Sequence, residues 1–169
     1  MTQILLMRGL NDAGRVEIDI RAVHRCLGSL GAGSITSLMQ NGNTICQHEV
    51  DPFEVAQLLD AHHGVRPFIL AMTRDEWRAR VVENPFEGAA TKMVHVFFHA
   101  TDDIGDTADM EARAGKGEEI IATPGMIWLY AERGAAKSKL VDQIDALSDN
   151  PLIARSLHLV NQIHRTAGA

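Results

Sequence analysis

The stretch Gly33–His48, Gly-Ser-Ile-Thr-Ser-Leu-Met-Gln-Asn-Gly-Asn-Thr-Ile-Cys-Gln-His, decides the fold of this chain. Asn41 and Gly42 lie at its centre, and an Asn-Gly pair tolerates the positive φ angles that both central residues of a type I′ turn require. Because apolar residues occur on both sides, the stretch predicts a β-hairpin with strands over Ser34–Gln40 and Asn43–Glu49. One long strand with a bulge at Gly42 is the alternative.

The elements around this hairpin predict a first subdomain. In chain order they are a buried strand over Gln3–Met7, a helix over Ile18–Leu30, the hairpin, a helix between Asp51 and Gly64, and a strand over Arg66–Ala71. Asp19 and Asp51 are suited to cap the two helices, because a carboxylate can accept hydrogen bonds from the free N–H groups of a first turn. The order β-α-β-β-α-β is that of ferredoxin-like units, so we expect an N-terminal ferredoxin-like subdomain over residues 1–72.

The remainder of the chain partly repeats this order. Thr73 and Glu76 have the spacing of a capping box, which predicts a helix and loop that bridge the two halves over residues 73–91. Beyond it the chain predicts a strand over Met93–His99, a helix over Thr107–Ala114, a hairpin of Glu118–Thr123 and Met126–Glu132, a helix over Ser138–Leu147, and a last helix over Ile153–Arg165 with an extended start as an option. A C-terminal α+β subdomain over residues 92–169 is expected to pack closely on the first. The predicted fold class is α+β, with two ferredoxin-like subdomains whose antiparallel sheets are covered by helices.

Composition narrows the class of protein. The net charge of −6 argues against nucleic-acid binding, which needs a basic face to displace counterions. The sequence shows no N-terminal targeting segment and no apolar run long enough to span a membrane, so we expect a cytoplasmic protein without a membrane partner. Cys26 and Cys46 have no metal or redox spacing and occur in apolar surroundings, which predicts buried free thiols.

Four stretches, taken in order, resemble the bacterial family known as domain of unknown function 1697. They are Met7–Asn11 followed by Gly14, Met39–Asn43, Asn84–Phe86, and Ile127–Tyr130 followed by Gly134 and Ser138–Leu140. The family pattern has glycine where Ala13 stands and serine where Asn41 stands. It has Thr-Arg-Asn-Trp where Ala154–Leu157 stands, so only Arg155 is shared there. The resemblance implies an α+β fold with ferredoxin-like subdomains and implies no particular activity.

Two loops are candidates for an anion site. In the first, Arg8 stands at a strand end and is followed by Gly, Asn, Asp and Gly, whose N–H groups could cradle an anion beside the guanidinium. In the second, Gly134 precedes a helix that Ser138 is suited to cap, and Lys137 and Lys139 lie near its N-terminus. The helix dipole favours anions there and mildly disfavours cations, so these lysines hint at a negative ligand. The alternatives are a tight β-α connection for the first loop and a solvated basic turn for the second.

The hairpin turn offers amide groups as well. Gln40 and Asn43 could present their side chains to a ligand beside these loops. The alternative is that asparagine at a turn bonds its own backbone, which is its commoner use.

The histidines and acidic residues predict no metal site. His95 and His99 share one face of a predicted strand, but at about 3.3 Å per residue they stand roughly 13 Å apart, too far for one ion. The seven acidic residues between positions 101 and 119 lack the spacing of a calcium loop, and such a charge run predicts a solvated segment. The sequence also has no Gly-x-Ser-x-Gly motif, which would mark a serine nucleophile. We therefore expect no metal and no cofactor.

The leading hypothesis is a binding domain for a small anionic ligand that carries phosphate or carboxylate. The predicted site collects the polar residues of these loops and motifs: Arg8, Asn11, Gln40, Asn43, Ser138, Lys139 and Arg155. One alternative is a module for protein interaction or homodimerisation without catalysis, because exposed sheet edges can pair. The other is an enzyme on a nucleotide or acyl substrate, with Asp12, Cys46 or a histidine as its titratable group.

Overall fold

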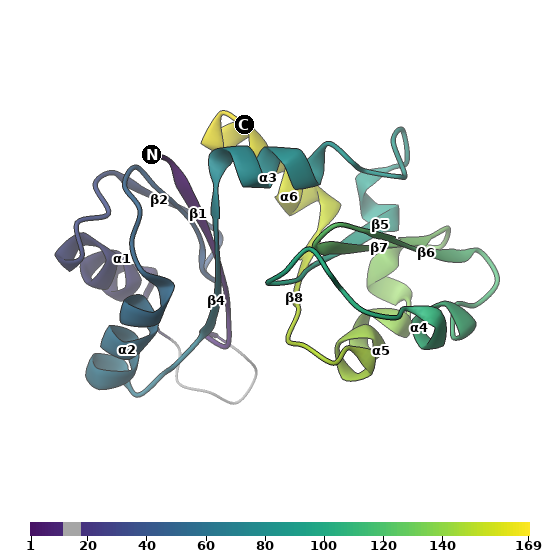
Figure 1. Ribbon diagram of the computed structural model, residues 1–169, viewed down its shortest axis with the longest axis horizontal. Coiled ribbons are helices and arrows are strands. Elements are labelled where there is room, and N and C mark those ends of the chain that lie inside the picture. The colour runs from purple at the N-terminus through teal and green to yellow at the C-terminus, as the bar shows by residue number, and fades with distance from the viewer. Residues whose placement is uncertain (12–17) are drawn as a thin grey trace. The chain divides into compact units, whose positions relative to one another are not determined.

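The computed structural model describes residues 1–11 and 18–169. These residues form two compact units, each built on one four-stranded antiparallel sheet with helices against it (Figure 1). The first unit comprises Met1–Arg78 and Gln162–Ala169, and the second comprises Ala79–Asn161. The chain is therefore of the α+β class, as the sequence predicts. The sequence did not indicate that the last residues join the first unit.

The first unit has the element order β-α-β-β-α-β. Its elements are β1 (Gln3–Arg8), α1 (Ile20–Ser29), β2 (Ile35–Leu38), β3 (Asn43–Cys46), α2 (Pro52–His63) and β4 (Phe68–Thr73). The strand order is β2-β3-β1-β4, so β1 pairs antiparallel with both β3 and β4. Both helices lie against one face of the sheet (Figure 1). Because side chains two apart on a strand share a face, Leu5 and Met7 of β1 both join the core with Val23, Leu27 and Leu59.

The helix ends of this unit follow from local sequence. The Asp19 side chain accepts a hydrogen bond from the Arg21 N–H at 2.9 Å, and the Asp51 side chain accepts one from the Phe53 N–H at 2.8 Å. Both predicted N-caps are confirmed. The predicted end of α2 is also confirmed, since Gly64 adopts a left-handed φ of 66° as its C-cap.

α3 (Arg74–Val81) begins with the predicted capping box. The Thr73 N–H and hydroxyl donate to Glu76 Oε2 at 2.7 and 2.8 Å, and the Glu76 N–H donates to the Thr73 hydroxyl oxygen at 3.2 Å. The chain leaves the first unit within this helix, between Arg78 and Ala79. α3 thus follows β4 without an intervening loop, and hydrogen bonds between Thr73 and Glu76 in both directions close its first turn.

The central hairpin is confirmed, but its turn differs from the predicted one. Leu38 of β2 pairs with Asn43 of β3, so a four-residue loop joins the strands. The positive φ angles fall on Met39 (62°) and Gly42 (82°), whereas a two-residue type I′ turn needs them on Asn41 and Gly42. The Asn43 amide explains the difference, because it donates to the Leu38 carbonyl at 3.0 Å and to Asn41 Oδ1 at 2.6 Å. A buried side chain therefore shapes the loop.

Replacing Gly42 by alanine should destabilise the protein strongly. A Cβ at this position would lie 2.6 Å from Leu10 Cδ1 and 2.7 Å from Met7 Cβ, and the φ of 82° is strained for any residue with a Cβ. We expect Gly42→Ala to lower the free energy of unfolding by about 3 kcal/mol, measured by urea denaturation.

Gly64→Ala is the matched control for this substitution. Gly64 has a similar φ of 66°, but no described atom lies within 4 Å of the added Cβ. The free energy of unfolding should therefore fall in this control only by the cost of backbone strain, about 1 kcal/mol. Equal losses in the two variants would contradict a close contact at Gly42.

The second unit repeats the element order and the strand order. Its elements are β5 (Val94–Phe98), α4 (Ala108–Ala112), β6 (Glu118–Thr123), β7 (Met126–Ala131), α5 (Leu140–Leu147) and β8 (Ile153–Ser156), with short 3₁₀ turns at Thr91–Met93 (η1) and Ala135–Lys137 (η2). The sheet has the order β6-β7-β5-β8, and α4 and α5 lie against one of its faces (Figure 1). Phe97, Leu129, Met110 and Ile144 pack between the sheet and these helices.

The last predicted helix has the extended start that the sequence left as an option. Ile153–Ser156 form β8, which pairs antiparallel with β5, and α6 spans Leu157–Ala167. The Ser156 hydroxyl accepts a hydrogen bond from the Leu159 N–H at 3.3 Å at the point where the strand becomes a helix.

Candidate functional site

The residues of the predicted site fall in both units. Those of the first unit are Arg8, Asn11, Gln40 and Asn43, and those of the second are Ser138, Lys139 and Arg155. Each group is therefore described within its own unit.

Asn11 connects three segments of the first unit. Its Nδ2 donates to the Gln40 carbonyl at 2.5 Å, and its Oδ1 accepts from the Ile18 N–H at 2.9 Å. Arg8 is exposed at the end of β1, opposite Phe68 in the sheet. Residues 12 and 14 of the predicted anion loop lie outside the described residues. In the described part of this loop, the Asn11 side chain therefore forms hydrogen bonds within the β-α connection. Such a connection is the alternative that the sequence offers to an anion site.

The two hairpin amides differ in exposure. Asn43 is 1% exposed, and its Nδ2 donates to Leu38 and Asn41 within the hairpin. Gln40 is exposed, and its carbonyl oxygen accepts from Asn11. The Gln40 side chain therefore faces solvent, whereas the Asn43 amide is used in shaping the turn.

Arg155 lies buried on β8 of the second unit. It is 8% exposed, and its Nη1 donates to the Ala154 carbonyl at 2.8 Å. Burial lowers the pKa of Arg155 to about 10, which leaves it cationic at neutral pH. Its neighbour across the sheet is β5, where Val96 faces Arg155 and His95 faces Ser156.

His95 should make the stability of the protein depend on pH. Burial, and to a smaller extent the charge of Arg155, lower the pKa of His95 below its ordinary value of 6.5. Below pH 6.5 the unfolded chain takes up this proton more readily than the folded chain, so the free energy of unfolding should fall as pH falls. We expect the loss between pH 7.5 and pH 5.5, measured by urea denaturation, to be smaller in His95→Gln. The same loss in both proteins would contradict this assignment.

The cysteines are buried free thiols, as predicted. Burial raises the pKa of Cys46 to about 11 and also raises the pKa of Cys26. Because the thiolate is the nucleophilic form, Cys46 on β3 is held in its inert protonated state.

A cleft of about 560 Å³ opens in the second unit. Two segments line it, residues 113 and 115–118, which lead into β6, and residues 131–134 and 137–140, which run from the end of β7 to the start of α5, together with Gln143 of α5. Ser138 and Lys139 of the predicted site are among the lining residues.

Strand pairing brings these two segments together. β6 and β7 are antiparallel, and Glu118 at the start of β6 pairs with Ala131 at the end of β7. The loop before β6 and the loop after β7 therefore emerge at the same end of the sheet. The Glu132 N–H also donates to the Gly117 carbonyl at 2.9 Å and continues this pairing into the loops.

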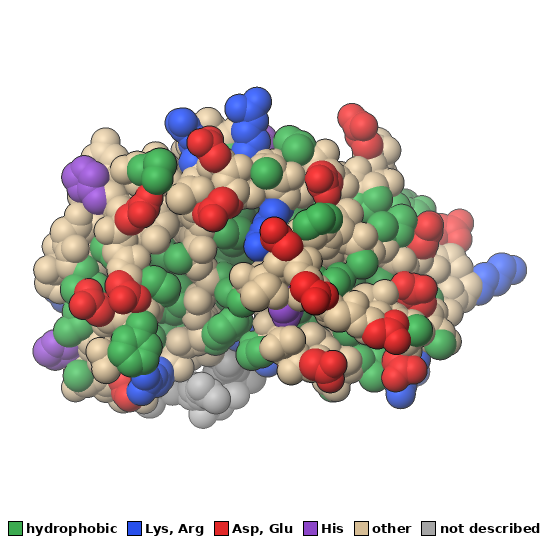
Figure 2. Space-filling model, viewed as in Figure 1, with side chains coloured by type: hydrophobic (Ala, Val, Ile, Leu, Met, Phe, Trp, Pro, Cys, Tyr) green, Lys and Arg blue, Asp and Glu red, His purple; other side chains and the backbone are tan. Residues whose placement is uncertain are grey.

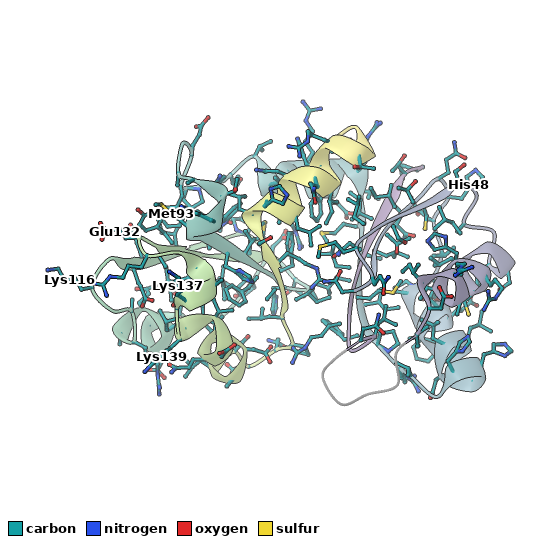
Figure 3. All side chains as sticks on the ribbon, turned by 180° about the vertical axis from the view of Figure 1, so that it is seen from behind. His48, Met93, Lys116, Glu132, Lys137 and Lys139 are labelled. Atoms are coloured by element: carbon teal, nitrogen blue, oxygen red, sulfur yellow. The ribbon has the colours of Figure 1, made fainter. Side chains whose placement is uncertain are left out.

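Cationic side chains dominate the cleft. The lining holds five of them: Arg113, Lys116, Arg133, Lys137 and Lys139. Three of the four lysines of the chain are in this set, although the chain as a whole carries a net charge of −6. All five residues are exposed, and none forms an ion pair with any residue that the structure describes. Figure 3 shows Lys116, Lys137 and Lys139 at one end of the second unit.

The start of α5 forms one wall of the cleft. The Ser138 Oγ accepts from the Leu140 N–H at 3.1 Å, which confirms that Ser138 satisfies an N–H group at this helix start. Lys139 occupies the N-cap position and makes no side-chain cap bond. Gly134, with a φ of 100°, turns the chain from β7 into η2 and so places Lys137 and Lys139 beside the helix start.

The sequence missed Arg113, Lys116 and Glu132 as members of this site. Lys116 stands between two glycines, which is a sign of a tight loop, but it lies within the acidic run that the sequence predicts to be solvated. Without the β6–β7 register, nothing in the sequence places this loop beside the start of α5.

The acidic run mainly stabilises its own loops. Asp103 accepts from the Gly105 N–H, Asp106 accepts from the Ala108 N–H, and Asp102 pairs with Arg80 at 3.0 Å. Figure 2 shows acidic side chains gathered over α4 and β6. Within residues 1–11 and 18–169, no group of three His, Cys, Asp or Glu side chains could hold a metal ion. None of the helices described is both long and apolar enough to cross a membrane.

Comparison with known proteins agrees with the resemblance in the sequence. A family model described as "Protein of unknown function (DUF1697)" matches residues 1–128, so the part of the fourth motif from Leu129 onward lies beyond the match. The structure of the conserved bacterial protein SP0830 from Streptococcus pneumoniae is similar, with a TM-score of 0.75 over 98% of both chains. At 16% sequence identity, this likeness is one of fold alone. No curated protein matches the chain.

Proposed function

The chain belongs to the DUF1697 family, whose description assigns no function, and we propose from the geometry of the second unit that it binds a small anionic ligand in the basic cleft. The ligand carries phosphate or carboxylate. The observation that carries the proposal is the gathering of five exposed cations that form no ion pair with the described residues. Such a cluster is self-repelling when empty, and a bound anion replaces that repulsion with attraction.

The N-terminus of α5 also favours a negatively charged ligand. Cations near a helix N-terminus are unfavourable by roughly 0.3–1 kcal/mol each, whereas an anion there is favourable by a similar amount. Lys137 and Lys139 occupy this unfavourable position at the start of α5. The cleft volume of about 560 Å³ also suits a small molecule, since ligand pockets usually measure about 300–1,000 Å³.

In this proposal Lys137 and Lys139 supply charge, and Ser138 helps to fix the loop that presents them. A contribution from Arg8, Asn11, Gln40, Asn43 or Arg155 stays a prediction from the sequence. The same holds for the cytoplasmic location, for homodimerisation, and for the subdomain bounds 1–72, 73–91 and 92–169. We also propose that both units are ferredoxin-like, which is supported by their shared β-α-β-β-α-β order and matching strand orders.

A thermal-shift titration with inorganic phosphate, and separately with citrate, tests the anion site. At a ligand concentration about a hundredfold above Kd, the melting temperature of the wild type should rise by about 5 °C. The double variant Lys137→Ala/Lys139→Ala should lose most of this rise, because two of the five cations are removed from the cleft. The rise should also shrink as sodium chloride is added, since the site is exposed to solvent.

Lys92→Ala is the matched control, because Lys92 is the one lysine of the chain that does not line the cleft. Lys92→Ala should show the same rise in melting temperature as the wild type. Equal responses in wild type, Lys92→Ala and the double variant would place any bound anion outside the cleft. No response to either anion in the wild type would refute the proposed function.

A further inference from the structure

The two carboxylates of the cleft are held in different ways. Glu118 Oε2 accepts from the Gly115 N–H at 2.8 Å and thereby closes the turn ahead of β6. The Glu132 carboxylate accepts no hydrogen bond and forms no ion pair with the residues that the structure describes. Both residues line the cleft, so Glu132 offers a hydrogen-bond acceptor that its own loop does not use.

A glycine leaves room for this carboxylate. Gly117 has a φ of 81°, and a Cβ on it would lie 2.8 Å from Glu132 Oε2 and 3.3 Å from Glu132 Cβ. Any other residue at position 117 would push the carboxylate away. The backbone bond from Glu132 to the Gly117 carbonyl fixes the two residues against each other. Figure 3 shows Glu132 at the same end of the unit as Lys116, Lys137 and Lys139.

This arrangement limits the chemistry of the ligand. A carboxylate only accepts hydrogen bonds, and it repels an anionic group placed next to it. A ligand that is anionic along its whole length would therefore meet repulsion from Glu132. A ligand with one anionic end and hydroxyl groups beyond it would satisfy the lysines and Glu132 together. Acidic side chains bind sugar hydroxyls in this way in dinucleotide-binding folds.

We propose that the cleft selects the phosphate monoester of a sugar, with the phosphate beside Lys137 and Lys139 and a sugar hydroxyl donating to Glu132. This inference rests on the proposed function, because it assigns a ligand class to the same anion site. Glu132 is the residue that distinguishes a sugar phosphate from other phosphate monoesters.

The test compares the Kd of ribose 5-phosphate with that of methyl phosphate by calorimetry. Methyl phosphate has the same anionic group and lacks the hydroxyls. In the wild type, ribose 5-phosphate should bind about tenfold more tightly, the effect of a hydrogen bond to a charged acceptor. In Glu132→Ala this ratio should fall close to one, while methyl phosphate should bind at least as tightly as before because a negative charge has been removed.

Gly117→Ala is the second variant, since it keeps every charge and displaces the Glu132 carboxylate. It should lower the ratio in the same direction, and its binding of methyl phosphate reports that the cleft is still folded. A ratio near one in the wild type would overturn the sugar selectivity and leave the anion site standing. A high ratio that survives in Glu132→Ala would overturn the role of Glu132. Absence of methyl phosphate binding in the wild type would refute the anion site itself and this inference with it.

Discussion

The first unit depends on a close contact that only glycine permits. Gly42 lies against Met7 and Leu10 at a distance that leaves no room for a Cβ. At the same place, the Asn11 amide joins the Gln40 carbonyl to the Ile18 N–H. The hairpin loop, the end of β1 and the approach to α1 are thus fixed together. Because β1 pairs with strands on both sides, the position of the loop is tied to the register of the whole sheet.

Features with local causes were predictable from the sequence. Element order, the caps at Asp19 and Asp51, and the Thr73–Glu76 box each depend on a few neighbouring residues, and all were confirmed. The hairpin turn was predicted wrongly because its φ angles depend on distant partners. Met7 and Leu10 pack on Gly42 from more than 30 positions away, and Asn43 is free to bond Leu38 only once the strands have paired.

The residues of the candidate site also differ in whether a local pattern of the sequence predicts them. Ser138 and Lys139 could be found from the sequence because a basic run before a helix is a local pattern. Lys116 and Glu132 could not be found in this way. Lys116 lies in an acidic segment, and only the pairing of Glu118 with Ala131 brings that segment beside Glu132 and the start of α5. Asn43 shows the converse case, because its amide is 1% exposed and donates to Asn41 within the turn, which the sequence left open as the alternative to ligand binding.

The division of the chain into units has a consequence for biosynthesis. Because residues 162–169 belong to the first unit, the second unit is inserted within the first along the chain. A ribosome therefore releases all of the second unit before the first can be completed, although the first begins to emerge earlier. The second unit is thus complete along the chain before residues 162–169, the last part of the first unit, are synthesised. The usual order of synthesis, in which the N-terminal domain is complete before the next one, therefore does not hold for this chain.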